Sequence, residues 1–378
     1  MRLAIVSTSS PLSRRSWSGI PYFATKEITR RFADVHIVDT ALLDRLVIKA
    51  HKFRKGQFQL LREPLLVKSY GLLLDRMLAR IAPDAVISIG APQKIGGLLD
   101  KYRTYHVADA MFDTVIRYYP KYRHMNARSA RLGHELQKSI VDKSSGLLLA
   151  SHWAAQSAAQ HYCTPLDRFT IAPMGANLET APPAIAPRKN DAPLKLLFVG
   201  YDWHRKGGAL CLEALGHIRR SDPDAELHVV GCNPRSAHGV AGVHVHGPLS
   251  KAYGPHADLF RRLFETSHFF IMPSHQEAYG LVYCEACAFS LPPVARDTGG
   301  VGEIVKHGEN GLLLPGSADA REYADAILHV WRDANAYAKM QKAARSAFET
   351  RLNWQAWGDT LEQVLTDSVE GPCLRATA

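Results

Sequence analysis

The sequence contains no apolar stretch that approaches the roughly 20 residues of a transmembrane helix. Its opening, MRLAIVSTSS, has too short an apolar part for a signal peptide, and it predicts a first β-strand instead. Cysteine is scarce, and six residues in a chain of 378 do not make a disulfide framework. These shortages argue against a membrane-spanning protein and a disulfide-stabilised secreted domain. We therefore expect reduced thiols and a cytoplasmic location.

Several common ligand-binding patterns are also missing. No RNA- or DNA-binding module is recognisable, so a nucleic-acid partner is not expected. Cys284 and Cys287 lie in a predicted helix, and no second pair follows at the spacing of a zinc site. The segment 200–208 is not a phosphate-binding P-loop, because that motif would need glycine in place of Arg205 and serine or threonine in place of Gly207.

The excess of basic charge lies in one half of the chain. Residues 1–190 hold 28 Lys and Arg against 14 Asp and Glu, whereas residues 191–378 hold 18 against 22. This asymmetry predicts that the first half meets an anionic partner, such as a membrane surface or a lipid-phosphate acceptor. The hydrophobic content of 46% is ordinary for a globular protein, and a chain of this length predicts two domains.

Residues 268–315 carry the most informative pattern. The apolar run His268–Met272 predicts a buried strand of a parallel sheet, and the spacing of Leu281–Ala288 predicts a helix. A second strand, Pro292–Ala295, runs into a glycine turn that opens another helix at Val301. Two successive strands thus each deliver a loop and a helix N-terminus to the same edge of the sheet. Backbone N–H groups converge there, which suits a phosphate-bearing ligand.

Two carboxylates flank the start of the first of these helices. Glu277 precedes the helix, and Glu285 lies about two turns inside it. Carboxylates in such places accept hydrogen bonds from sugar hydroxyls, as they do from ribose in other nucleotide-binding folds. The pattern therefore predicts a ligand that has both phosphate and hydroxyl groups.

This stretch resembles the Glu-x7-Glu signature of retaining GT-B glycosyltransferases, with the best match to family 4. The resemblance rests on Glu277 and Glu285, on Tyr279-Gly280 between them, and on the string Asp-Thr-Gly-Gly-Val at 297–301. It implies that Glu285 binds the nucleotide ribose and that Glu277 binds hydroxyls of the donor sugar. It also implies donor contacts at the two helix starts, from Tyr279, Gly280, Leu281, Gly299 and Gly300.

A further part of the donor site is expected after the strand Lys195–Val199. Arg205 and Lys206 are adjacent cations before a glycine-opened helix, which suits a pyrophosphate without a metal ion. In the family that the sequence resembles, an arginine and a lysine of this loop hold the donor diphosphate. Lys206 matches that lysine directly. Arg205 would take the arginine's role by substitution, because Tyr201 occupies the usual place.

The first half carries looser matches. The string Trp17–Tyr22 resembles a glycine-containing loop of the family, which implies that Gly19 faces the donor phosphates and the acceptor; a plain helix start is the alternative. Asp109 follows the strand Thr104–Val107, at the end where α/β proteins bind ligands. We expect Asp109 to bond hydroxyls of acceptor or donor, and His106 to be a strand residue.

Residues 41–82 alternate basic and apolar side chains, as in Lys49–Lys55 and Leu65–Lys68. Positively charged amphipathic helices often lie on membrane surfaces. The same pattern also occurs on helix faces that are only solvated, and the sequence leaves both interpretations open.

The resemblance implies the GT-B fold, an α/β architecture of two Rossmann-like parallel-sheet domains facing a central cleft. We place an acceptor-binding domain at residues 1–182 and a donor-binding domain at 183–352. Residues 353–378 are expected to form a helix that packs back on the first domain, plus a tail.

The implied activity is that of a hexosyltransferase-type enzyme that transfers a sugar from a UDP- or GDP-sugar to a hydroxyl with retention of configuration. The expected acceptor is a glycan or a lipid-linked sugar, in glycan, polysaccharide or glycolipid synthesis, and no metal or cofactor is required. The catalytic candidates are Glu277, Lys206, Arg205 and Asp109. Two alternatives remain: a sugar-nucleotide epimerase or phosphorylase on the same fold, and a catalytically silent, membrane-docked scaffold.

Overall fold

The computed structural model describes residues 1–14, 16–52, 60–183, 188–189, 192–251 and 254–370. The chain forms two compact units. The first comprises Met1–Met174 and the segment that begins at Trp354, and the second comprises Gly175–Asn353. The predicted boundary at residue 182 lies inside the second unit. The expected tail from residue 371 and the basic residues 53–55 lie outside the described ranges.

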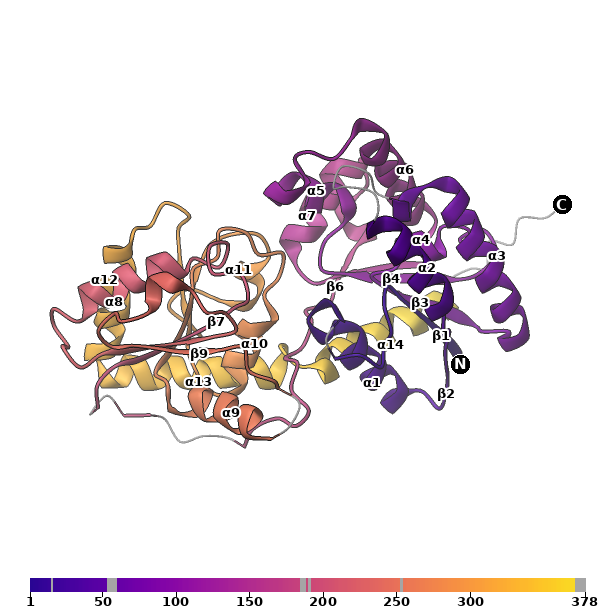
Figure 1. Cartoon of the computed structure of the whole chain (residues 1–378). Helices are drawn as coiled ribbons and strands as arrows, with labels where there is room; N and C mark the ends of the chain where they lie inside the picture. Colours follow the sequence, from indigo (N-terminus) through magenta and orange to yellow (C-terminus); the bar gives the residue numbers. More distant parts are fainter. Residues whose placement is uncertain (15, 53–59, 184–187, 190–191, 252–253, 371–378) are drawn as a thin grey trace. The chain divides into compact units, whose positions relative to one another are not determined.

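The first unit is built on a six-stranded parallel sheet with the order β2-β1-β3-β4-β5-β6 (Figure 1). The predicted strands are present, and β6 is an additional short one. Four of the six strands are buried almost throughout, as their apolar runs predict. The strands are β1 (Arg2–Ser7), β2 (Asp34–Ile37), β3 (Ala85–Ile89), β4 (Thr104–Ala108), β5 (Gly146–Leu149) and β6 (Thr170–Ile171).

Helices connect these strands and complete the unit: α1 (Ile20–Arg31), α2 (Ala41–Lys52), α3 (Pro64–Ile81), α4 (Pro92–Ile95), α5 (Phe112–Tyr118), α6 (Ala127–Lys143), α7 (His152–Tyr162) and α14 (Trp354–Glu370). Local capping fixes some of their starts. The side chain of Ser151 accepts a hydrogen bond from the Ala154 amide at 3.2 Å, which satisfies one of the unpaired N–H groups at the start of α7.

A buried lysine joins α2 to the end of β1. The Lys94 side chain is only 2% exposed, and its Nζ donates to the Ser7 carbonyl at 2.7 Å, to Thr40 Oγ1 at 2.8 Å and to Asp44 Oδ2 at 2.8 Å. A buried ammonium is tolerated only when its protons find such partners. These contacts therefore fix where the basic helix α2 begins.

The second unit contains another six-stranded parallel sheet, with the order β12-β11-β10-β7-β8-β9. Its strands are β7 (Lys195–Val199), β8 (Glu226–Val230), β9 (Val243–Gly247), β10 (Phe269–Met272), β11 (Pro293–Arg296) and β12 (Leu312–Leu314). Its helices are α8 (Gly208–Ile218), α9 (Pro255–Thr266), α10 (Leu281–Ala288), α11 (Val301–Ile304), α12 (Ala320–Arg332) and α13 (Ala334–Thr350). The strands predicted at Lys195–Val199, His268–Met272 and Pro292–Ala295 are present, and so are the helices predicted at Leu281–Ala288 and from Val301.

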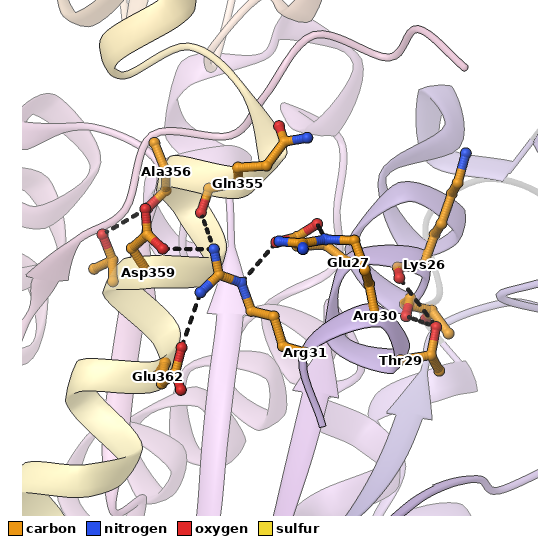
Figure 2. Close-up of polar contacts among 11 residues, drawn as sticks. Lys26, Glu27, Thr29, Arg30, Arg31, Gln355, Ala356, Asp359 and Glu362 are labelled. Atoms are coloured by element: carbon orange, nitrogen blue, oxygen red, sulfur yellow. Dashed lines mark hydrogen bonds and ion pairs between the residues drawn. The ribbon is translucent and has the colours of Figure 1, made fainter. Parts of the chain in front are cut away.

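The last helix, α14, packs against α1 of the first unit, and Figure 2 shows Arg31 of α1 reaching across to it. Arg31 Nη2 lies 2.5 Å from Asp359 Oδ1, and Nη1 lies 2.8 Å from Glu362 Oε2. Its Nε donates to Glu27 Oε1 at 2.6 Å. Gly358 leaves the space for this cluster, because a Cβ atom there would lie 2.3 Å from Arg31 Nε.

Among the helices of the described ranges, none combines the length and the apolar character that a bilayer crossing requires.

Candidate active site

Three predicted site residues of the second unit meet at the C-terminal ends of neighbouring strands. Arg205 and Lys206 follow β7, and Glu277 follows β10. Lys206 Nζ forms an ion pair with Glu277 Oε2, and Arg205 Nη1 lies 3.8 Å from the same oxygen. Arg205 Nη1 also donates to the Gln276 carbonyl at 2.8 Å. Two cations and one carboxylate thus share one small region at the edge of the sheet.

The two loops that carry these residues touch directly. The His275 amide donates to the Arg205 carbonyl at 2.8 Å. Gly207 has a φ of 76°, and a Cβ atom on it would lie 2.2 Å from the Pro273 carbonyl oxygen. Only glycine accommodates both the left-handed backbone and this close approach. The Gly207 position therefore sets the distance between the Lys206 loop and the Glu277 loop.

The third predicted element, the glycine turn after β11, joins the same region. The Gly300 amide donates to the Glu277 carbonyl at 3.2 Å, and Thr298 Oγ1 donates to the His275 carbonyl at 3.2 Å. Gly299 and Gly300 precede α11, and Gly280 precedes α10 with a φ of 97°. The starts of two helices therefore lie beside Glu277, where their N–H groups favour an anion.

The hydroxyl of Tyr279 is not part of this polar edge. Tyr279 is buried, with its hydroxyl 3.9 Å from Cys284 Sγ, and burial raises its pKa well above the ordinary range. Leu281 is likewise buried. The side chains of these two residues are therefore not placed to contact a ligand at this edge.

Glu285 is held by a partner that the sequence did not point to. Its carboxylate is buried, and Lys251 Nζ lies 2.6 Å from Oε1 and 2.5 Å from Oε2. Burial raises the pKa of Glu285, and the Lys251 charge acts in the opposite direction. Lys251 follows β9, and no local motif marked it, because only the folded sheet brings it to α10.

In the first unit, Trp17 brings together the segments of the two predicted residues Gly19 and Asp109. Trp17 Nε1 donates to Asp109 Oδ2 at 3.3 Å, and Asp109 Oδ1 accepts from the Ala110 amide at 2.8 Å. Gly19 caps α1 two residues after Trp17. Gly90, at the end of β3, gives room for the indole, because a Cβ atom there would lie 2.4 Å from the ring. The expected place of Asp109 at a strand end is confirmed.

His106 is a strand residue, as expected. It is 1% exposed in β4, its Nδ1 lies 3.1 Å from Ser88 Oγ, and burial lowers its pKa to about 4. Cys284 and Cys287 are buried and unbridged within α10, which agrees with the expectation of reduced thiols.

Comparison with solved structures identifies the fold. The sucrose-phosphate synthase of Thermosynechococcus elongatus superposes with a TM-score of 0.69 at 17% identity, over 98% of this chain and 100% of that one. Anabaena HepE, solved in complex with UDP, superposes with a TM-score of 0.67 at 15% identity, over 97% and 100% of the two chains. The fold is GT-B, with two Rossmann-like parallel-sheet domains, as the resemblance implied.

Sequence comparison adds a match to a protein family over part of the chain. Residues 185–347, which lie in the second unit, match the model of the family Glycosyl transferases group 1. The D-inositol 3-phosphate glycosyltransferase of Paenarthrobacter aurescens is 26% identical over 261 residues, which is 64% of this chain and 62% of that relative. The chain thus spans less than two-thirds of the length of this relative.

Proposed function

We propose that the protein is a retaining glycosyltransferase that transfers a sugar from a UDP- or GDP-sugar to a hydroxyl of a glycan or lipid-linked acceptor. The observation that carries the proposal is the meeting of Lys206, Arg205 and Glu277 beside two helix starts in the second unit. The family match of residues 185–347 and the likeness to a fold solved with UDP support it.

Catalysis in this proposal is the stabilisation of charge on the leaving diphosphate. Lys206 and Arg205 face the phosphates, and the amides at the start of α10 add further donors. Each such donor contributes about 3 kcal/mol of transition-state stabilisation in comparable sites. These protein groups perform the role that a divalent metal has in other transferases, so the proposal requires neither a metal nor a cofactor.

The Lys206–Glu277 ion pair gives the donor site two states. In the absence of donor, the ammonium is neutralised by the carboxylate. When the diphosphate binds, Lys206 exchanges the carboxylate for a phosphate oxygen, and Glu277 becomes free to accept hydrogen bonds from the sugar hydroxyls. Binding of phosphate and binding of sugar are thereby linked.

Glu285 is the proposed acceptor for the ribose hydroxyls. Its carboxylate is only 2% exposed, whereas the Lys251 side chain that covers it is 42% exposed. Lys251 can therefore share the carboxylate with the ribose hydroxyls, which keeps the buried charge of Glu285 paired. Asp109, with Trp17 on one of its oxygens, is the proposed contact for acceptor or donor hydroxyls from the first unit.

The test is calorimetric titration of UDP, GDP and ADP, without metal, into the native chain and into the Lys206→Ala and Glu285→Ala variants. We expect one nucleotide to bind tightly and both variants to lose most of that affinity. Lys342→Ala, which removes an exposed lysine of α13, should bind as the native chain does. A folded native chain that binds none of the three nucleotides would contradict the transferase proposal.

The alternatives differ in what they do with a bound donor. An epimerase converts the donor sugar in the absence of an acceptor, whereas a phosphorylase breaks a glycosidic bond of a glycan and transfers the sugar to inorganic phosphate. A silent scaffold binds lipid but neither binds nor converts the donor. Product analysis with the donor that matches the calorimetric nucleotide, with and without acceptor, separates these outcomes from sugar transfer.

We further propose that the first unit binds anionic membranes through α2 and α3. Leu42 of α2 and Leu65 of α3 are 79% and 78% exposed, and exposed basic residues accompany them on both helices. Exposed leucines next to cations suit the boundary between lipid headgroups and acyl chains. The exposed residues of this kind are Leu42, Arg45, Leu46, Lys49, Leu65, Lys68, Leu72, Arg76 and Arg80.

Vesicle sedimentation tests this contact. The chain should sediment with vesicles that contain anionic lipid and not with purely zwitterionic ones, and added salt should weaken the binding. Replacing Leu42 and Leu46 by serine should reduce binding without changing nucleotide affinity. Equal binding to both kinds of vesicle would remove the support for an anionic membrane partner.

A further inference from the structure

Two histidines and a glutamate of the second unit share one face of the sheet, away from the candidate active site. Glu226 and His228 are two positions apart on β8, so their side chains point to the same face. His244 of β9 is the direct partner of His228 in the sheet. Glu226 begins β8, whereas Lys206 and Glu277 follow the C-terminal ends of their strands. The cluster is therefore distinct from the donor site.

The three side chains are already close enough to hold one ion. His228 Nε2 lies 3.2 Å from Glu226 Oε2, and His244 Nε2 lies 3.7 Å from Glu226 Oε1. One ligand atom from each residue falls within 4.8 Å of the others. Bonds of 2.0–2.1 Å to a tetrahedral zinc ion place its ligands about 3.4 Å apart. His244 is half-exposed, and its ring stacks on that of His228 with the centroids 4.9 Å apart, so it must move inward and turn toward the carboxylate to complete that geometry.

A fourth residue is placed to orient one of the ligands. His228 Nδ1 lies 3.0 Å from His246 Nε2, on the side of the ring opposite to Glu226. Metal-bound imidazoles usually donate their second N–H to such a partner, which fixes the tautomer that leaves the other nitrogen for the metal. With Nδ1 donating to His246, the Nε2 lone pair of His228 points to the carboxylate side.

We propose that Glu226, His228 and His244 bind one zinc-like divalent ion, with water as the fourth ligand and His246 as the positioning residue. Two imidazoles and one carboxylate are a ligand set that zinc accepts, whereas magnesium and calcium prefer oxygen ligands alone. The ion would connect β9, the outermost strand of its sheet, to β8.

The positive charge of a neighbouring lysine opposes binding of the ion, so its removal tests the proposal. Lys195 Nζ, on the adjacent strand β7, lies 3.5 Å from Glu226 Oε2. Its ammonium competes with a divalent ion for this carboxylate. Replacing Lys195 by methionine should therefore tighten zinc binding, by about tenfold for the removal of one like charge near the site.

The experiment is calorimetric titration of the chain, without a purification tag, with Zn²⁺. We expect saturable 1:1 binding that an excess of Mg²⁺ does not displace. The affinity for Zn²⁺ should fall about tenfold in His246→Ala, which removes a residue that only positions a ligand. It should fall by more than tenfold in each of the three ligand variants His228→Gln, His244→Gln and Glu226→Gln. His238→Gln, which changes an exposed histidine bonded to Asn233, is the matched control and should bind as the native chain does.

Cobalt substitution gives a second readout that does not depend on affinity. Co²⁺ at this site should show the visible bands of a four-coordinate ion without the charge-transfer absorption of a thiolate ligand. A thiolate band would place the metal on a cysteine, such as the exposed Cys163, and would overturn the proposal. Binding that is absent, or unchanged in the three ligand variants while circular dichroism shows them folded, would overturn it as well.

Discussion

At the scale of single residues, the candidate active site depends on how closely two loops approach at Gly207. The loop after β7 carries Lys206, and the loop after β10 carries Glu277. Their ion pair requires that the Gly207 backbone lie against the Pro273 carbonyl, with no Cβ atom between them. The charge arrangement of the site is thus a consequence of backbone packing as well as of residue type.

Gly207→Ala should destabilise the second unit by about 3 kcal/mol or more, because it combines left-handed strain with a steric overlap. Gly239→Ala is the matched control, since Gly239 has a similar φ of 73° but nothing within 4 Å of its added Cβ atom. It should cost only about 1 kcal/mol. Urea denaturation measures both values, and equal losses would show that the loop contact contributes nothing.

His106 makes a contribution to stability that depends on pH. Burial lowers its pKa from 6.5 to about 4, so the unfolded chain takes up a proton at higher pH than the folded chain does. The contribution is therefore fully present above pH 6.5 and is lost as the pH falls toward 4, by up to about 3 kcal/mol. His106→Asn should flatten this part of the stability profile. His124→Asn, at an exposed histidine, should leave it unchanged.

At the scale of elements, the attachment of α14 to α1 depends on polar contacts as well as apolar packing. Arg31 joins Glu27 of its own helix to Asp359 and Glu362 of α14, and it also donates to the Gln355 carbonyl at 2.6 Å (Figure 2). The Arg31 side chain is 12% exposed, so these partners replace most of its water. Loss of the space at Gly358 would break this arrangement.

Gly358→Ala should destabilise the first unit by about 1 kcal/mol. The gain in helix propensity is about 1 kcal/mol, but the displaced guanidinium loses charged hydrogen bonds that contribute about 1.5–3 kcal/mol each. Gly216→Ala in α8 is the control, because no atom lies within 4 Å of its added Cβ atom. It should stabilise the protein by about 1 kcal/mol. Calorimetric unfolding of the full chain shows whether each variant is more or less stable than the native chain. A stabilising Gly358→Ala would contradict the role given to the Arg31 cluster.

At the scale of the whole molecule, the proposed donor-site residues Arg205, Lys206 and Glu277 all belong to the second unit. A nucleotide at 100 times its Kd should therefore stabilise that unit by about 2.7 kcal/mol. Hydrogen exchange should show added protection in residues 200–208 and 274–301, with little change in the sheet of the first unit. Protection confined to the first unit would contradict the assignment of the donor site.

Local patterns in the sequence predicted many of the strands and helices and the residues that stand at their ends. Hydrophobic runs and glycine turns are local signals, so they placed Lys206, Glu277 and Asp109 after the correct strands. The strands β6 and β12 were not predicted, because two or three residues are too few to show a period.

Which side chains became partners depended on the tertiary fold. Lys251 and Glu285 are 34 positions apart, and Trp17 and Asp109 are 92 apart. The zinc-like cluster likewise needs β8 and β9 to pair in one register. No local pattern encodes such contacts, because they depend on the order of strands in the sheet and on the space that Gly90, Gly207 and Gly358 leave open.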